Sequence, residues 1–207
     1  MTAATPSLPH YLRPGLRLVF IGYNPAIYSA EAGHYYARGG NAFWRQLGES
    51  ELVGRAPGEG LGPEDDALLM DEAGIGFTDL CPRPTVRAEH LTRDEIIQGA
   101  HRLHAELLEH QPRVAVFSGR GIYQQFARHA LGLSAKELAT RPYGEQPERI
   151  APIQNPKSQI QNPTVPWVIP SSSGLASKWH GRRLELLREL AGELDAQPEP
   201  RATKRRV

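Results

Sequence analysis

The 207-residue sequence contains a single cysteine, Cys81. One cysteine cannot form an internal disulfide, and it cannot supply a four-cysteine zinc or iron–sulfur site. A low cysteine content is typical of proteins in a reducing compartment, and we therefore expect the protein in the cytosol. No apolar run approaches the roughly 20 residues that a membrane-spanning helix needs, and we expect no membrane contact. The first residues also lack the basic region and long apolar stretch of a secretory signal.

The signatures of several enzyme classes are missing or incomplete. The stretch SGRGIYQQF (118–126) has G-x-G without the third glycine of a dinucleotide site, and no G-x-x-x-x-G-K-[ST] phosphate loop occurs. The serines at 171–173 are not set in a G-x-S-x-G elbow. His101 and His104 have no third metal ligand nearby in the sequence, so we interpret them as ordinary helix residues. We interpret Cys81 as a small, partly buried side chain, and we expect neither a metal nor a cofactor.

Charge is nearly balanced, at a formal net +1, but it is unevenly distributed. The final RATKRRV is basic, whereas residues 58–72 are acidic. We predict a flexible N-terminal segment over 1–13, one domain over 14–194, and a disordered basic tail over 195–207. The tail is expected to be a weak auxiliary contact to polyanions at most.

Short apolar runs rich in Val, Ile and Phe alternate with amphipathic stretches, and they predict strands over 17–22, 75–80, 114–119 and 167–170. Thr92 and Glu95 form a capping box before a helix, and further helices are predicted over 121–129, over 179–194 and from about residue 41. In the helix over 179–194, the spacing predicts that Leu184, Leu187 and Leu190 face inward. Residues 143–166, rich in Pro, Gln and Asn, are predicted to be irregular.

This alternation predicts an α/β fold, a three-layer α/β/α sandwich around a central, mainly parallel sheet of four to five strands. Such sheets bind ligands beyond the carboxyl ends of their strands. The loops over 22–40, 78–85 and 171–178 are therefore the candidate binding loops.

Asn24 follows the first predicted strand and precedes Pro25, which restricts the backbone of both residues. A rigidly held asparagine presents its amide to a ligand or a water. The alternative is a local turn in which Asn24 bonds its own backbone, and the loop by itself favours that alternative.

The stretch PSSSGLASKW (170–179) places Leu175 among small residues and hydroxyls. A serine N-cap would explain the serines, but it does not explain the leucine. An apolar tip with Lys178 close by suits a wedge inserted between base pairs, with hydroxyls and the ammonium group near phosphates.

Three stretches, FIGYNPAIYSAEAGHYYARGGNAFW, GFTDLCPRPTVRAEHLT and WVIPSSSGLASKW, occur in this order. Together they resemble the mismatch-specific uracil/thymine DNA glycosylase family, within the uracil-DNA glycosylase superfamily. The resemblance runs from about Pro14 to Leu190. It implies a uracil-DNA glycosylase-like fold over the domain at 14–194.

The resemblance also implies roles for residues. Asn24 matches the asparagine that positions the attacking water. Tyr36 matches the aromatic ring against the flipped base, and Ser29 matches a position near the C5 edge of the pyrimidine. On physical grounds, backbone N–H groups around Gly22–Ala37, including those of Gly22 and Tyr23, are expected to stabilise the departing base. The second motif supplies the wedge that fills the vacated stack, here Gly174, Leu175 and Ala176. Arg120 matches a basic position at a helix start that contacts a phosphate, and its alternative is a solvated surface arginine. The other expected DNA contacts, from the residues themselves, are Ser171, Ser172, Ser173 and Lys178.

The chain departs from the family pattern in its second motif. Bacterial members often have Asn-Pro-Ser-Gly-Leu-Ser-Arg there, whereas the triple serine is similar to the vertebrate thymine glycosylases, without their Ala-Arg wedge. Asn24 is also a poor general base, because an amide takes up no proton near neutrality. Asp79, at a strand's carboxyl end, is the candidate that assists it. Asp94 competes, although the helix dipole gives it a structural role.

The sequence thus predicts a monofunctional glycosylase that hydrolyses the N-glycosidic bond of uracil mispaired with guanine. Thymine or modified pyrimidines are weaker candidate substrates. The expected partner is double-stranded DNA bound by a monomer, in the cytosol or nucleoid of a bacterium. Two alternatives remain open: a mismatch- or abasic-DNA binding module that does not cut, and a small-molecule nucleoside hydrolase, for which Leu175 would have no purpose.

Overall fold

The structure, a computed structural model, describes residues 7–54, 60–151 and 163–196. Its centre is a five-stranded sheet in the order β2-β1-β3-β5-β4. The strands are β1 (Leu18–Gly22), β2 (Ile75–Asp79), β3 (Val114–Phe117), β4 (Gly144–Glu145) and β5 (Val165–Val168). All neighbours pair in parallel except β4, which runs antiparallel to β5. The predicted, mainly parallel sheet is confirmed.

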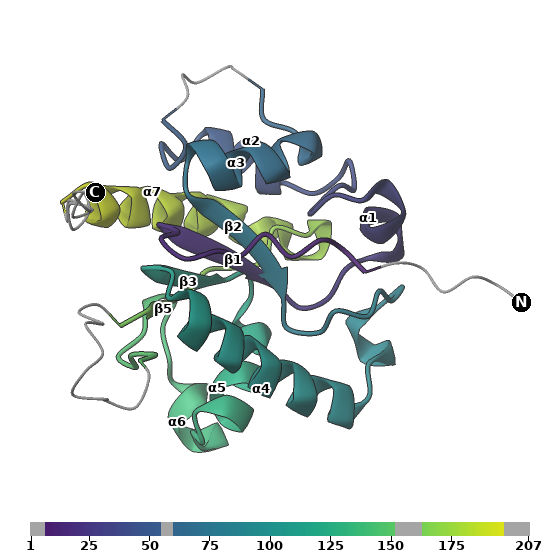
Figure 1. The fold of residues 1–207 in the computed structure, drawn as a ribbon, viewed down its shortest axis with the longest axis vertical. Helices are drawn as coiled ribbons and strands as arrows, with labels where there is room; N and C mark the ends of the chain where they lie inside the picture. Colours follow the sequence, from purple (N-terminus) through teal and green to yellow (C-terminus); the bar gives the residue numbers. More distant parts are fainter. Residues whose placement is uncertain (1–6, 55–59, 152–162, 197–207) are drawn as a thin grey trace, which may run out of the picture.

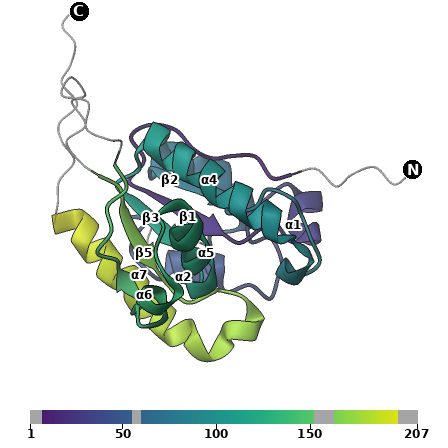
Figure 2. The same cartoon turned by 90° about the horizontal axis from the view of Figure 1, so that it is seen from below.

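Helices cover both faces of this sheet and form the other two layers (Figure 1). One layer contains α2 (Phe43–Gly48), α3 (Asp66–Glu72) and α7 (His180–Ala196). The other contains α4 (Arg93–His110), α5 (Arg120–Ala130) and α6 (Ala135–Ala139). Figure 2, viewed from the side of α4 and α5, shows these helices in front of the strands. A short helix, α1 (Ile27–Ala32), lies in the loop that follows β1.

The side chains of β1 show why its sequence is continuously apolar. Leu18 and Phe20 belong to the core cluster formed with α2 and α7, whereas Val19 and Ile21 belong to the cluster formed with α4 and α5. Successive side chains of a strand point to opposite faces, and both faces of this sheet are covered. Every residue of β1 and β2 is therefore buried.

The helix predictions hold, with one correction. Thr92 caps α4 through its hydroxyl, which accepts from Glu95 N at 3.2 Å, and Glu95 Oε2 accepts from Thr92 N at 2.8 Å. In α7, Leu187 and Leu190 are buried as predicted, but Leu184 is only half-buried. The inward face instead includes residues 183, 186, 187, 190, 191 and 194, a three-and-four spacing that places an arginine in the core.

Two further predictions are wrong in part. Residues 7–13 are not a free segment: Leu8 is buried, and Tyr11 exchanges two backbone hydrogen bonds with Phe77 of β2 at 3.0 and 3.1 Å. Within 143–166, β4 and a bridge between Ile150 and Thr164 add to the sheet, so the described part is not irregular throughout. Residues 1–6, 152–162 and 197–207, which include most of the predicted tail, lie outside the described residues. No helix in the described ranges combines the length and apolar character needed to cross a membrane.

Candidate active site

A cavity of about 270 Å³ lies at the carboxyl ends of the parallel strands. All three predicted binding loops contribute to its wall, and so does the loop after β3. Its predicted members are Gly22, Tyr23, Asn24, Ser29 and Tyr36 after β1, Asp79 at the end of β2, and Ser171, Ser172 and Ser173 after β5. The fold thus brings together residues that are up to 151 positions apart in the sequence (22 to 173).

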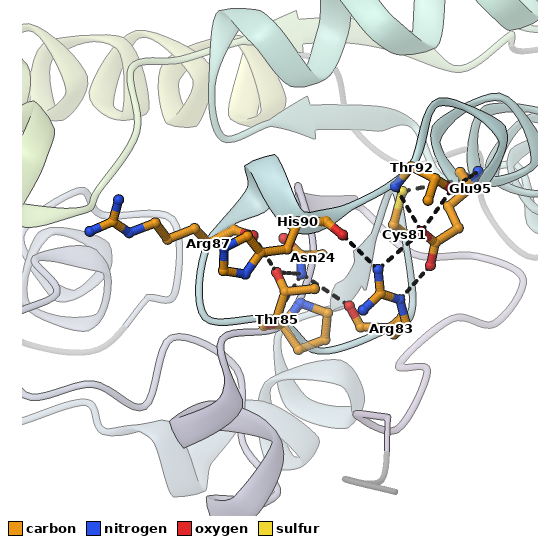
Figure 3. A network of polar contacts seen from close by, with 9 residues as sticks. Asn24, Cys81, Arg83, Thr85, Arg87, His90, Thr92 and Glu95 are labelled. Carbon is orange, nitrogen blue, oxygen red and sulfur yellow. Dashed lines mark hydrogen bonds and ion pairs between the residues drawn. The ribbon is translucent and has the colours of Figure 1, made fainter.

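Asn24 is held by a network that Figure 3 shows in close-up. Its Nδ2 donates to Thr85 Oγ1 at 2.7 Å, to the carbonyl oxygen of Arg83 at 3.0 Å and to that of Pro25 at 3.2 Å. The Thr85 hydroxyl itself donates to the carbonyl of Arg87 at 2.7 Å, so it accepts from Asn24. Because all three partners accept, nitrogen must occupy this position and the amide orientation is determined.

The other end of the Asn24 amide is free for a ligand. Oδ1 accepts no hydrogen bond from any residue in the ranges that the structure describes, and Asn24 lines the cavity. The local turn that was the alternative interpretation is present only as the bond to the Pro25 carbonyl, the longest of the three. The two shorter bonds reach the loop after β2, which also pairs with the Asn24 loop through Thr85 N and Pro25 O at 3.1 Å. The side chain is therefore a rigid acceptor aimed by two loops.

Asp79 places a carboxyl group in the same cavity wall, with only 7% of the residue exposed. Burial raises the pKa of this carboxyl to about 7, an effect that the Arg102 charge partly opposes. Arg102 donates to the main-chain oxygen of Asp79, and no hydrogen bond or ion pair within the described part of the chain reaches the carboxyl itself. The group therefore changes its charge near neutrality, as a general base requires.

Asp94, the competing carboxylate, is exposed in the first turn of α4 and does not line the cavity. Its position fits the helix-dipole interpretation. The structure thus separates two carboxylates that the sequence left in competition.

Tyr36 forms part of the cavity wall in a fixed orientation. Its φ of 52° lies in the left-handed region, and its ring stacks on Phe43 with centroids 3.9 Å apart and planes 7° apart. The hydroxyl donates to Ser118 Oγ at 3.2 Å. The pKa of Tyr36 is raised, mainly by burial, so the hydroxyl stays protonated. Tyr36 is half-buried, and it lines the cavity.

Tyr35, the residue before Tyr36, has a structural role. It is buried, its ring stacks on Phe77 at 5.4 Å, and its hydroxyl donates to the carbonyl of Pro9 at 2.9 Å. The backbone N–H of Tyr35 donates to Asp66 Oδ2 at 3.0 Å. Asp66 is fully buried on α3 and also lies 3.1 Å from His34 Nδ1. Asp66 therefore anchors the loop that carries Tyr35 and Tyr36. It lies in the acidic stretch over 58–72, and no sequence motif identifies it.

Ser29 is buried and its hydroxyl accepts from Ala37 N at 3.3 Å, which closes the loop between α1 and Tyr36. The residue lines the cavity, and its contact with the C5 edge of a pyrimidine stays a prediction. Tyr23 also contributes to the wall, and its carbonyl accepts from Cys81 N at 2.9 Å.

The loop after β5 presents an apolar tip to solvent. Leu175 is completely exposed on the 3-10 helix η3 (Gly174–Trp179), beside a second hollow of about 380 Å³. Ser173 has N-cap backbone geometry but makes no side-chain cap bond, so the N-cap alternative explains little here. Ser171 Oγ donates to Ser173 Oγ at 3.2 Å, and the Ser172 carbonyl accepts from Ala42 N at 3.1 Å. Gly174 joins Leu175 in lining the second hollow, whereas Ala176 and Lys178 lie further along η3.

Arg120 begins α5, and its guanidinium lies 4.5 Å from the centre of the Tyr143 ring. It is half-buried, and its Nε has no hydrogen-bond partner among the described residues. The side chain is therefore more constrained than the solvated arginine that was the alternative.

Sequence reasoning missed some lining residues. Ser118 and Ile122 follow β3. The rule that ligands bind beyond the carboxyl ends of parallel strands, applied to β3 as well, would have predicted them. Arg38 and Asn41 line both hollows. Leu8 also lines the cavity, and only tertiary packing brings it there.

The side chains dismissed as metal ligands or nucleophiles keep ordinary roles. No cluster of three or more His, Cys, Asp or Glu suited to a metal occurs in the part that the structure describes. His101 is exposed and His104 half-buried on α4. Cys81 is buried, and burial raises the pKa of its thiol to about 11, which keeps it protonated and unreactive.

The chain is similar to known proteins in sequence and in fold. The model of the Uracil DNA glycosylase superfamily matches residues 9–195. Over 145 residues, the chain is 32% identical to the G/U mismatch-specific uracil DNA glycosylase of Schizosaccharomyces pombe (strain 972 / ATCC 24843). That match covers 69% of this chain and 42% of the relative, so the chain spans less than half of the relative's length.

The fold is also similar to a solution NMR structure of a proposed uracil DNA glycosylase from Methanosarcina acetivorans. The TM-score is 0.56 at 19% identity, and the match covers 92% of this chain and 98% of the other. This likeness concerns the fold alone. The family match includes all five strands and every residue of the cavity wall except Leu8.

Proposed function

Because the chain belongs to the uracil DNA glycosylase superfamily, we propose that it is a monofunctional DNA glycosylase. It hydrolyses the N-glycosidic bond of uracil mispaired with guanine, leaves an abasic site and so initiates base excision repair. The observation that carries this proposal is the pairing, in one cavity, of a rigid amide acceptor on Asn24 with the near-neutral carboxyl of Asp79.

The reaction requires that the uracil leave the duplex. Rotating a base out of the stack costs about a few kcal/mol, and least for a mismatched pair. Leu175, fully exposed beside the second hollow, fills the vacated stack and offsets part of that cost. The flipped base enters the cavity against Tyr36, whose stacking on Phe43 keeps the ring in place.

The hydrolysis then proceeds with two side chains. A water donates one hydrogen bond to Asn24 Oδ1 and gives its proton to the Asp79 carboxylate as its oxygen bonds to C1′. The electron pair of the C1′–N1 bond leaves with uracil. Backbone N–H groups from Gly22 onward stabilise the negative charge that develops on the base. Thymine and modified pyrimidines, which are bulkier near Ser29, are accepted more slowly.

The proposed partner is double-stranded DNA bound by a monomer in the cytosol. Incubation of a labelled G·U duplex with the protein, followed by alkali, tests the activity. We expect strand scission by the wild type, also with a chelator present, and scission reduced to background by Asn24→Ala. Tight binding of the duplex by a wild-type protein that produces no scission would establish the binding module instead. Release of uracil from free deoxyuridine, with none from DNA, would establish the nucleoside hydrolase.

A further inference from the structure

Arg183 of α7 is a fully buried charge that the mechanism above does not use. Its Nη1 donates to Gln46 Oε1 at 2.8 Å, whereas Nε and Nη2 have no hydrogen-bond partner within the described ranges. None of the ion pairs between described residues includes it. Burial lowers the pKa of Arg183 to about 10, so the guanidinium still carries its charge at neutral pH. Leaving a buried charge unpaired costs stability, so packing alone does not explain an arginine here.

Arg183 is connected to the cavity through two stacked rings. Its guanidinium carbon lies 5.2 Å from the centre of the Phe43 ring, and Phe43 stacks on Tyr36, which lines the cavity. The charge also acts on Tyr36: burial raises the pKa of the Tyr36 hydroxyl, and the Arg183 charge works to lower it. The protein thus holds a buried positive charge next to the stack that ends at the cavity wall.

The departure of uracil explains what such a charge does. In the proposed mechanism the electron pair of the C1′–N1 bond leaves with the base, so negative charge develops against Tyr36. The face of an aromatic ring is itself negative and repels an anion. A cation near the adjoining ring opposes that repulsion, and it is screened far less in the protein interior than in water. The Arg183 charge therefore stabilises the departing anion more than the neutral base that is bound before the reaction.

We propose that Arg183 is a positioning residue for excision: its charge, acting through the Phe43–Tyr36 stack, makes the cavity favour the uracil anion over neutral uracil. This inference rests on the proposed function. The alternative is a structural role, because the bond from Arg183 to Gln46 joins α7 to α2, and Gln46 Nε2 also donates to the His180 carbonyl at 2.6 Å. The two roles predict different results when the leaving base is changed.

Excision of two bases of different acidity separates the roles. Fluorine withdraws electrons, so 5-fluorouracil carries the leaving negative charge more easily than uracil does and depends less on the protein. We expect Arg183→Met, which keeps much of the volume and removes the charge, to lower single-turnover excision of uracil from a G·U duplex about tenfold. With 5-fluorouracil in the same duplex, the loss should be less than about threefold. Equal losses on both bases, or no loss on uracil, would overturn the inference.

Three further variants accompany Arg183→Met. Arg183→Lys keeps the charge and should excise both bases within about threefold of the wild type. Arg183→Gln, also neutral, repeats the comparison of the two bases if Arg183→Met does not fold. Arg188→Met is the matched control, because Arg188 is an exposed arginine of α7 whose Nε donates to the Glu49 carbonyl at the end of α2 at 3.2 Å. Its charge is screened by solvent, so this variant should excise as the wild type does, and a loss equal to that of Arg183→Met would contradict the role of the buried charge.

Thermal stability is a readout that a structural role would change in the opposite direction. Replacing an unpaired buried charge by an apolar side chain is often neutral or stabilising. We therefore expect Arg183→Met to melt at or above the wild-type temperature while its excision of uracil falls. A clearly lower melting temperature, together with equal losses on both bases, would establish the structural role instead.

Binding of free bases tests the charge without any excision. Barbiturate is a pyrimidine anion at about pH 6, where uracil is neutral and the Asp79 carboxyl is mostly protonated. In NMR titrations, we expect Arg183→Met to bind barbiturate about tenfold more weakly than the wild type and to bind uracil equally well. If the wild type excises neither base while this difference persists, the proposed function fails and the effect of Arg183 on the cavity stands. If the wild type excises uracil normally while both proteins bind barbiturate equally, the inference on Arg183 alone fails.

Discussion

Gly22 and Asp79 are register partners at the ends of β1 and β2, and the Asp79 carboxylate occupies the space beside Gly22 that a side chain would need. A Cβ on residue 22 would overlap Asp79 Oδ1. Only glycine at this position lets the carboxyl group enter the cavity wall next to the Asn24 loop. The glycine at the end of β1 and the aspartate at the end of β2 therefore depend on each other.

We expect Gly22→Ala to displace the Asp79 carboxyl and lower the single-turnover excision rate about 100-fold, the effect of misplacing a catalytic group by about 1 Å. Gly39→Ala is the matched control, because a Cβ there meets no atom within 4 Å. Nearly normal excision by Gly22→Ala would contradict the proposed role of Asp79.

The pH dependence of excision reports the charge of Asp79. Its pKa, raised by burial to about 7, makes the carboxylate a minority species below neutrality. Since the carboxylate accepts the proton of water, the single-turnover rate should rise about tenfold per pH unit below 7 and level off above it. Asp79→Asn should give a low, flat profile. A wild-type rate that falls above pH 7 would show that the protonated form acts instead.

Asp79 also links stability to pH. A carboxyl whose pKa is higher in the folded protein than its usual value of 3.8 binds more protons when folded. Its contribution therefore favours folding below about pH 4 and is lost as the pH rises toward 7. We expect Asp79→Asn to melt several degrees above the wild type at pH 8, with the difference vanishing near pH 4. Thermal melts at a series of pH values measure this, and a constant difference would refute the burial of a titrating carboxyl.

Thr85 orients the amide of Asn24, so its hydroxyl should influence the chemical step. Thr85→Val removes the shortest of the three bonds to Nδ2, and we expect kcat to fall about tenfold with little change in KM. Thr164→Val is the control, because it removes a buried hydroxyl that donates to Pro112 O at 2.6 Å and does not line the cavity. That variant should lose stability and keep its kcat. Equal kcat values for the two variants would remove Thr85 from the mechanism.

Leu175 is expected to act on duplex DNA only. Leu175→Ala removes the apolar tip that replaces the flipped base, so excision from a G·U duplex should fall about tenfold or more. Excision from single-stranded DNA should change by less than about twofold, since no stack needs filling. Side-by-side rates on the two substrates measure this selectivity. A loss of equal size on both would mean that Leu175 is not a wedge.

The sequence was sufficient for the features that depend on neighbouring residues. Continuous apolar runs predicted β1, β2, β3 and β5, because buried parallel strands are apolar on both faces. The capping box at Thr92 predicted the start of α4. The rule that parallel sheets bind ligands at the carboxyl ends of their strands identified the loops that carry Asn24 and Asp79.

Only the tertiary structure decided how these residues behave. Asn24 receives its orientation from Arg83 and Thr85, about 60 positions away, and Asp79 receives its near-neutral pKa from burial. Arg183 is the clearest case: it is fully buried, donates to Gln46 Oε1 at 2.8 Å and lies 5.2 Å from the Phe43 ring centroid. An arginine in the sequence of α7 reads as a surface residue. Hydrogen bonding and desolvation depend on which distant segments meet, and no periodicity along the chain encodes that.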